Sequence, residues 1–289
     1  MISRYYRFAG LDLAITMPED LMYEKEYRLA PFRVDSVTDP HRFVFEKREQ
    51  LEAPRGQLEI LEGNYRVYRQ GERMIRYLGP VKSGWEAAYF RVESEGKENW
   101  VQLRACDYPG AASAKTVLDA LWVEHLMAGE SAFLFHCAYI AWEGQAILFT
   151  APSETGKSTQ AELWQKYRGA EIINGDRAAV RLTEKGLVAE GIPFSGSSSY
   201  CSSRALPIRA VVYLDQAPQT IIRKLRGYEA FAKIWEGISV NIWDKKDLER
   251  VSGVVEMLAA TVPVYHMPCT PDEAAVTALE QTLRKQVTL

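Results

Sequence analysis

Eight consecutive residues, Ala151 to Ser158, carry the clearest chemical signal in this chain. Their sequence, Ala-Pro-Ser-Glu-Thr-Gly-Lys-Ser, follows an apolar run and departs from the pattern GxxxxGK[ST] at its first position, where alanine replaces glycine. In that pattern, the backbone N–H groups of the loop and the N-terminus of the next helix face an anion. The lysine reaches the outer phosphates and the following hydroxyl ligates Mg²⁺. The loop therefore predicts a binding site for Mg·ATP.

The context of the loop supports this interpretation. The run Ala146–Thr150 leads directly into it, and Ala161, Trp164 and Tyr167 share one face of the helix expected after it. Alanine at position 151 is costly only if the backbone there needs a positive φ. The alternative is a surface turn that contains Gly-Lys-Ser by chance. We expect Ser158 to ligate Mg²⁺ and the ATP contacts to come from Ser153, Glu154, Thr155, Gly156, Lys157, Ser158 and Thr159.

Phosphoryl transfer also needs a carboxylate, to bind the metal or to accept the proton of the attacking hydroxyl. Asp176 follows Ile172–Gly175 directly after the helix of the loop, and Asp215 closes an apolar run as the aspartate of a Walker B strand does. Either residue can instead cap a turn. Of the two, Asp176 is favoured, because its segment comes directly after the helix of the loop. His136 lies in an apolar strand just before the loop strand, where a histidine alone is more often a core residue than a catalyst.

Two halves of the chain differ in their hydrophobic pattern. From Tyr5 to about Arg104, short alternating runs are separated by turn signals, which predicts a β-rich domain. Three- and four-residue spacing of apolar residues from Val117 to Leu126 then predicts an amphipathic helix. We place the boundary near 107–112, which gives a β-rich domain over 1–110 and an α/β domain over 111–289. Within the latter we expect strands at 133–140, 146–150, 171–173, 178–182, 209–214 and 220–224. The C-terminal helix is expected to start from a capping box at Thr270–Glu273, with proline at the first helical position.

Composition excludes several partner classes. The formal net charge is −3, so no surplus of basic residues attracts nucleic acid or an anionic membrane. No run reaches the roughly 18 apolar residues needed to span a bilayer, and the N-terminus is too polar for a signal peptide, so we expect a cytoplasmic protein. The four cysteines, among them Cys106, form no CxxC pair and indicate buried or free thiols.

Together these residues resemble the HPr kinase/phosphorylase superfamily, and in particular its kinase-like branch, which includes serine kinases of lasso peptide biosynthesis. The resemblance covers about 133–283: a histidine on one strand (His136), a hairpin, a strand, the GKS loop, a helix and the pair Asp176-Arg177. The segment 262–276 is similar to the C-terminal part of these kinases. The resemblance implies a P-loop fold like that of HPr kinase and phosphoenolpyruvate carboxykinase. It also implies phosphate and Mg²⁺ binding by Lys157 and Ser158, and a role for Asp176 as metal ligand or general base, with His136 tuning its protonation.

The chain departs from the family at one carboxylate. HPr kinases have two adjacent aspartates where this chain has Gly175-Asp176, which argues against the phosphorylase back-reaction and against HPr as the substrate. Arg204, after a Ser- and Gly-rich segment, is the candidate for a cation that steadies the transferred phosphoryl group. Glu190 is the candidate for a second metal ligand. The alternative for both residues is a solvated loop charge.

The sequence thus predicts a kinase that uses ATP and Mg²⁺ to phosphorylate a hydroxyl, a serine of a peptide or small protein, with the β-rich domain helping to bind the acceptor. A homo-oligomer is left open. One alternative is a nucleotide sensor or peptide-binding module with decayed catalysis, which the replacements at Ala151 and Gly175 favour. Another is a relative of ATP-dependent phosphoenolpyruvate carboxykinase. Against it, the chain is short and has no His/Asp cluster suited to a second metal ion.

Overall fold

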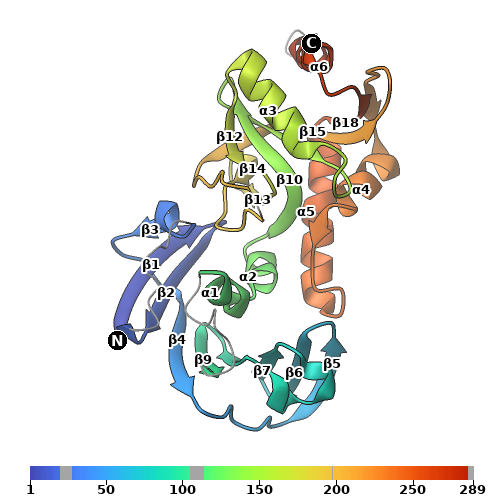
Figure 1. The fold of residues 1–289 in the computed structure, drawn as a ribbon. Helices are drawn as coiled ribbons and strands as arrows, with labels where there is room; N and C mark the ends of the chain where they lie inside the picture. Colours follow the sequence, from blue (N-terminus) through green and yellow to red (C-terminus); the bar gives the residue numbers. More distant parts are fainter. Residues whose placement is uncertain (20–27, 105–113, 197, 286–289) are drawn as a thin grey trace. The chain divides into compact units, whose positions relative to one another are not determined.

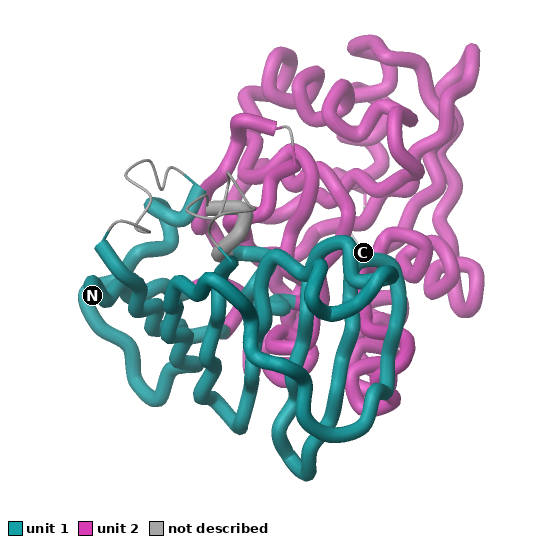
Figure 2. Tube along the Cα trace, turned by 60° about the horizontal axis from the view of Figure 1, so that its bottom comes forward, with its two compact units in different colours: residues 1–7, 11–123 teal, residues 8–10, 124–289 magenta. Residues whose placement is uncertain are grey.

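The computed structural model describes residues 1–19, 28–104, 114–196 and 198–285 and shows a mixed α/β protein with two sheets (Figure 1). The chain divides into two compact units, coloured separately in Figure 2: residues 1–7 with 11–123, and residues 8–10 with 124–289. The boundary expected at 107–112 lies outside the described residues. Among those described, no helix is long and apolar enough to cross a membrane.

The first unit is built around a nine-stranded sheet with the order β3-β1-β2-β4-β9-β8-β7-β6-β5. Alternation produces its buried face: in β2, Leu11, Leu13, Ile15 and Met17 are buried and the residues between them are not. The predicted β-rich character of this part is confirmed. Its strands are β1 (Ile2–Phe8), β2 (Leu11–Met17), β3 (Arg33–Val34), β4 (His41–Arg48), β5 (Gln57–Glu62), β6 (Tyr65–Gln70), β7 (Arg73–Leu78), β8 (Phe90–Glu95) and β9 (Glu98–Arg104).

The helix predicted across 117–126 is two helices, α1 (Ala114–Leu121) and α2 (Val123–Gly129). They are separated by Trp122, whose φ of 54° no helix interior allows. The reason lies in a contact that sequence spacing does not reveal. Within the first unit, the guanidinium of Arg76 stacks over the Trp122 ring at 4.3 Å and donates to the carbonyl oxygen of Ala120 at 2.8 Å.

In the second unit, two long strands, β10 and β15, each take part in two layers. The first part of β10 pairs with β13 and β17, and its second part pairs with β11 and β12. The first part of β15 pairs with β14, and the rest runs parallel to β11 and β18. The strands are β10 (Ala132–Trp142), β11 (Gln145–Thr150), β12 (Glu171–Asn174), β13 (Arg177–Thr183), β14 (Gly186–Glu190), β15 (Ala205–Gln216), β16 (Arg223–Leu225), β17 (Ile238–Ser239) and β18 (Val264–Cys269).

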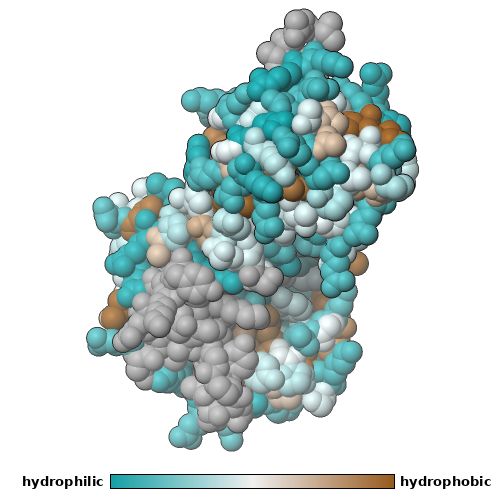
Figure 3. Space-filling view, turned by 45° about the horizontal axis from the view of Figure 1, so that its top comes forward, coloured by the Kyte–Doolittle hydropathy of each residue, from teal (hydrophilic) through white to brown (hydrophobic). Residues whose placement is uncertain are grey.

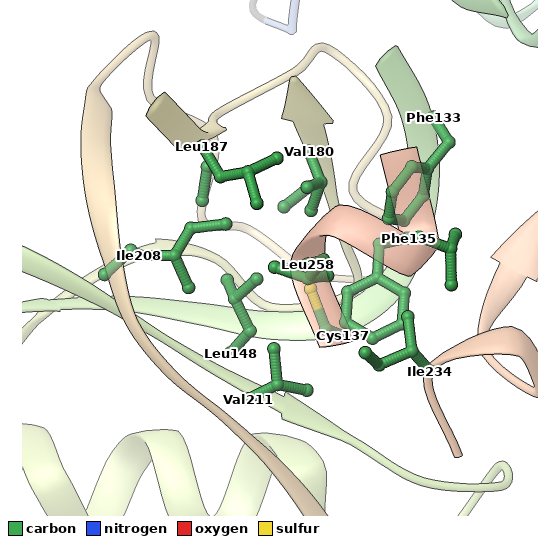
Figure 4. Close-up of a cluster of buried hydrophobic side chains, with 14 of the residues drawn as sticks. Phe133, Phe135, Cys137, Leu148, Val180, Leu187, Ile208, Val211, Ile234 and Leu258 are labelled. Carbon is green, nitrogen blue, oxygen red and sulfur yellow. The ribbon is translucent and has the colours of Figure 1, made fainter. Parts of the chain in front are cut away.

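One hydrophobic core fills the space between these two layers and extends to helices α4 (Gly227–Trp235) and α5 (Lys245–Thr261). Figure 4 shows Phe135 and Cys137 of β10 in this core together with Leu148 of β11 and Val211 of β15. We predicted neither helix from the sequence. In α5, the buried residues Val251, Val254, Val255 and Leu258 have the spacing of one helix face, so the signal was present.

A second core lies on the opposite face of the strands, under α3 (Lys157–Arg168) and α6 (Glu273–Lys285), which contact each other. Trp164 is fully buried there against Trp142 and Phe149. The start of α6 differs from the prediction. Its N-cap is Asp272, whose carboxylate accepts from the backbone N–H of Ala274 and Ala275, while Thr270 donates its hydroxyl to Asp272.

Among the residues that are coloured in Figure 3, hydrophilic ones cover much of the face, and the hydrophobic ones stand in small groups. Exposed large apolar residues of the second unit include Ile221, Tyr228 and Ile242. Some exposed apolar surface is normal for globular proteins.

Candidate functional site

The loop predicted from the sequence connects β11 directly to α3. Gly156 is the N-cap of α3 and has a φ of 114°, a value that side chains rarely permit, although there is open space around it. As a glycine, Gly156 has no side chain to cap α3. Its first N–H groups and the positive end of its dipole are therefore available to an anion. Ser153, Glu154, Ser158 and Thr159 are exposed around this end.

The side chain of Lys157 folds back onto the backbone of its own loop. Its side chain is buried, and its ammonium donates to the backbone carbonyls of Ala151 at 3.0 Å and Pro152 at 3.1 Å. Burial lowers the pKa of Lys157, and the nearby Asp176 carboxylate opposes that shift. The lysine is thus a partly desolvated cation held at the centre of the loop, which is the position from which it could contact a bound phosphate.

The backbone φ angles in the loop show whether alanine at position 151, where the motif has glycine, strains the loop. Ala151 is buried in the second core and is not among the residues with positive φ. Glu154 is, with a φ of 64°. Alanine therefore fits its place without strain, and the residue with a side chain that is strained in this loop is Glu154, one of the expected ATP contacts.

Ser158 connects the helix to the second candidate segment. Its hydroxyl donates to the carbonyl oxygen of Gly175 at 3.4 Å, and Asp176 is the next residue. The structure thus brings Lys157, Ser158 and Asp176 to the same end of α3.

Asn174 fixes the turn that carries Asp176, and the sequence analysis did not identify it. Its side-chain oxygen accepts from the backbone N–H of Asp176 and Arg177, both at 3.0 Å. Its amide nitrogen donates to the carbonyls of Ile192 and Phe194. Asn174 is fully buried, so all of this hydrogen bonding is shielded from water. The dipeptide Asn-Gly before Asp176 was the available sequence signal for this turn.

Two cationic or basic side chains flank the Asp176 carboxylate. His136 Nε2 lies 3.5 Å from one oxygen, and Arg177 Nε donates to the other at 3.2 Å. His136 comes close because it stands opposite Arg177 in the pairing of β10 with β13. Mainly through His136, and further through Arg177, the pKa of Asp176 is held below its usual value, while burial acts in the opposite direction. Asp176 is therefore a carboxylate that stays ionised at neutral pH.

A serine occupies the space in which the family's other aspartate would need to fit. A Cβ added to Gly175 would lie 2.4 Å from Ser198 Oγ and 2.9 Å from Ser198 Cβ. Gly196, with a φ of 53°, approaches the Asp176 carboxylate so closely that a Cβ there would lie 2.8 Å from it. The Ser- and Gly-rich segment therefore packs directly against Gly175 and Asp176.

The remaining predicted residues have partners of their own. Arg204 forms an ion pair with Glu171, which is at the opposite end of β12 from Asn174, about 10 Å away for a strand of this length. Glu190 is buried and pairs with Arg181. The phosphoryl-binding role of Arg204 and the metal-binding role of Glu190 stay predictions.

Asp215 lies closer to the loop than its distance in sequence suggested. Because β15 runs parallel to β11 with Tyr213 opposite Thr150, Asp215 stands at the same edge of the sheet from which the loop leaves. Its carboxylate is 2.6 Å from His266 Nε2. It thus stands at the sheet edge next to the loop and contacts a histidine.

A cavity of about 540 Å³ adjoins the loop within the second unit. Three segments line it: the loop with the first turn of α3, the end of β15, and the connection from β18 to α6. The lining residues are Glu154, Thr155, Gly156, Thr159, Gln160, Gln216, Ala217, Cys269, Thr270 and Pro271.

Of the comparisons with known proteins, only the comparison with solved structures gives a match. No protein-family model and no curated protein matches the chain. Among solved structures, the HPr(Ser) kinase/phosphatase from Coxiella burnetii is similar, with 12% sequence identity and a TM-score of 0.35, over 54% of this chain and 99% of that one. The name of that solved protein is the name of the superfamily that the sequence motifs resemble. The functional argument below rests on the residues of the site.

Proposed function

We propose that this protein is a phosphotransferase that uses Mg·ATP to phosphorylate a hydroxyl group, a serine of a peptide or small protein. One observation carries the proposal: three functional groups lie at the same end of α3. They are the Lys157 ammonium inside the loop, the Ser158 hydroxyl and the Asp176 carboxylate. Ser158 donates to the carbonyl oxygen of the residue just before Asp176. A cation for phosphates and two oxygen ligands suited to Mg²⁺ are what phosphoryl transfer requires of a protein.

The residues present fit ATP and Mg²⁺. The uncapped N-terminus of α3 offers N–H donors for phosphate oxygens, and Ser158 and Asp176 offer hard oxygen ligands for Mg²⁺. When bound, the metal neutralises charge on the phosphates. Lys157 would exchange the carbonyls of Ala151 and Pro152 for phosphate oxygens.

In the proposed reaction, a bond forms between the acceptor hydroxyl oxygen and the γ-phosphorus, and the bond from that phosphorus to the β–γ bridging oxygen breaks. ADP leaves, and the proton of the hydroxyl passes to solvent water. A general base works best with a pKa near the operating pH. The lowered pKa of Asp176 therefore favours a role in binding the metal and orienting the hydroxyl over a role as proton store.

The test is turnover by the full chain with labelled ATP, excess Mg²⁺ and a pool of serine-containing peptides, with a serine-to-alanine pool as the control. Lys157→Ala should lower kcat by roughly 100-fold or more and reduce ATP affinity less, because the contact serves the transition state. Lys166→Ala, an exposed lysine on the same helix, is the matched control and should have no effect. Equal kcat for Lys157→Ala and wild type at saturating Mg·ATP would refute the site.

A second function is favoured by one observation. Ser198 fills the space beside Gly175, so a second carboxylate like that of HPr kinases has no room there. A nucleotide sensor without catalysis would tolerate this loss. Tight binding of Mg·ATP with no ADP formed, whether serine peptides or water is the acceptor of the phosphoryl group, would establish the sensor in place of the kinase.

A further inference from the structure

Three side chains with metal-ligating groups meet in the second unit, outside the site described above. His125 belongs to α2, Asp244 is the N-cap of α5, and Asp247 lies in the first turn of α5. One ligand atom of each residue lies within 4.8 Å of those of the other two. His125 and Asp247 are 122 positions apart, so no spacing in the sequence revealed this cluster.

Hydrogen bonds hold the cluster in place and leave carboxylate oxygens for a ligand. His125 Nδ1 lies 2.8 Å from Asp247 Oδ2, and Asn241 Nδ2 donates to the same oxygen at 3.2 Å. Asp244 Oδ1 accepts from the backbone N–H of Lys246 at 3.0 Å and of Asp247 at 3.2 Å. These four contacts use one oxygen of each carboxylate, so Asp247 Oδ1 and Asp244 Oδ2 can bind a cation.

The charge balance of the cluster favours a cation. Asp247 is only 1% exposed, and burial of a carboxylate without a counter-charge is costly. Among the described residues, neither carboxylate is paired with a lysine or an arginine, and Lys245, next to Asp244, pairs with Glu249. The imidazole of His125 can carry one positive charge against two negative ones. The cluster is therefore anionic in either protonation state of the histidine.

We propose that His125, Asp244 and Asp247 bind one Zn²⁺ ion, with a water molecule as the fourth ligand. An imidazole and two carboxylates form a mixed nitrogen and oxygen donor set. Imidazole is a ligand that suits Zn²⁺, whereas Mg²⁺ and Ca²⁺ prefer oxygen ligands. The ion joins α2 to the start of α5.

The spacing of the ligand atoms suits this ion. Zn²⁺ binds nitrogen and oxygen at about 2.0–2.2 Å, so the ligands of a tetrahedral site are roughly 3.3–3.6 Å apart. The three ligand atoms already lie within 4.8 Å of one another, and small side-chain rotations bring them to this spacing. None of the three residues belongs to the candidate phosphate site, so zinc binding and phosphoryl transfer can be tested separately.

Calorimetry with Zn²⁺ on the full chain, stripped of metal with EDTA and then freed of the chelator, tests the site. Wild type should bind Zn²⁺ in the micromolar range or more tightly, and the ion should raise the urea midpoint of unfolding. Asp244→Asn should bind Zn²⁺ at least tenfold more weakly, since loss of a group that merely supports a ligand already costs that much. Asparagine caps helices as well as aspartate does, so this variant should fold. Asp272→Asn, the same exchange at the N-cap of α6, is the matched control and should keep wild-type affinity.

Cobalt gives a second measurement, which reports the ligands. Tetrahedral Co²⁺ absorbs visible light much more strongly than octahedral Co²⁺, so wild type should show strong bands, Asp272→Asn should keep them, and His125→Gln should lose them. Urea unfolding in EDTA checks that each variant is folded. Failure of wild type to bind Zn²⁺ at micromolar concentrations overturns the proposal. Equal affinity of wild type, Asp244→Asn and His125→Gln also overturns it, because the ion would then be held by other residues.

Discussion

The hydroxyl of Ser158 donates to the carbonyl oxygen of Gly175 across 3.4 Å, so the first turn of α3 contacts the turn that carries Asp176. This relationship connects two segments that the sequence could only suggest to be neighbours. It also explains why the position of Asp176 is set by the backbone: Asn174 holds the turn, and Ser158 contacts it from the helix.

Exchange of each candidate carboxylate for its amide tests which one serves phosphoryl transfer. Asp176→Asn keeps the shape of the side chain and removes its charge, so nucleotide should still bind while transfer nearly stops. Asp215→Asn should reduce transfer much less, because its carboxylate is held by His266 at 2.6 Å. The measurement is single-turnover transfer from labelled ATP, with the same acceptor and excess Mg²⁺ for both variants.

Asp215 is a demanding comparison because the parallel pairing of β15 with β11 places it at the same edge of the sheet as the loop. If the Asp215 variant is the inactive one, the Walker B assignment replaces ours.

The charge of Asp176 should also affect how the free energy of unfolding changes as the pH falls. His136 and Arg177 hold its folded-state pKa below 3.8, the value of the unfolded chain. The carboxylate therefore contributes to the free energy of unfolding at pH values above 3.8, and this contribution is lost as the pH falls through the folded-state pKa. Urea unfolding from pH 6 to pH 3 should show a shallower decline for Asp176→Asn than for wild type. Identical slopes would mean that the interactions with His136 and Arg177 do not persist in solution.

Two glycine substitutions in the loop should change stability in opposite directions. Ala151→Gly should lower the free energy of unfolding by a few tenths to about 1 kcal/mol, because Ala151 has no positive φ and glycine loosens the unfolded chain. Glu154→Gly should raise it by a similar amount, because the φ of 64° strains a residue with a side chain. Urea unfolding measures both effects. The affinity for Mg·ATP should barely change in Ala151→Gly; a large gain would mean that alanine compromises the phosphate site.

The sequence predicted those parts of the site that depend on local pattern. An apolar strand, a loop with Gly-Lys-Ser and an amphipathic helix are consecutive, so their order and type could be predicted from residues 146–167 alone. The contacts of Asp176 could not, because they depend on the pairing of β10 with β13 and on the segment that contains Gly196. The same applies to the break at Trp122, which Arg76 stabilises from a strand far away in sequence.

Ser198 explains why position 175 is a glycine, and this can be tested by stability alone. Gly175 has no positive φ, so its backbone accepts any residue, and the obstacle to a side chain is steric. Ser198 is itself held, since its N–H donates to the Ser195 carbonyl and its hydroxyl oxygen accepts from Tyr200 N–H at 3.2 Å. Gly175→Ala should therefore cost about 1–3 kcal/mol of unfolding free energy, the usual effect of overpacking. Gly175→Asp, which would restore the paired aspartates of HPr kinases, should cost at least as much.

A double-mutant cycle isolates this contact. In a Ser198→Gly background, Gly175→Ala should lose most of its cost, which gives a coupling energy of about 1 kcal/mol or more between the two positions. Gly253→Ala is the matched control: it lies in α5, has nothing within 4 Å of an added Cβ, and should show no coupling to Ser198. Urea unfolding of wild type, the two single variants and the double variant measures the four free energies of unfolding. Strictly additive effects of Gly175→Ala and Ser198→Gly would mean that the serine does not occupy this space, and the missing carboxylate would then need another explanation. Strong coupling would mean that restoring the carboxylate at 175 requires removal of Ser198 as well.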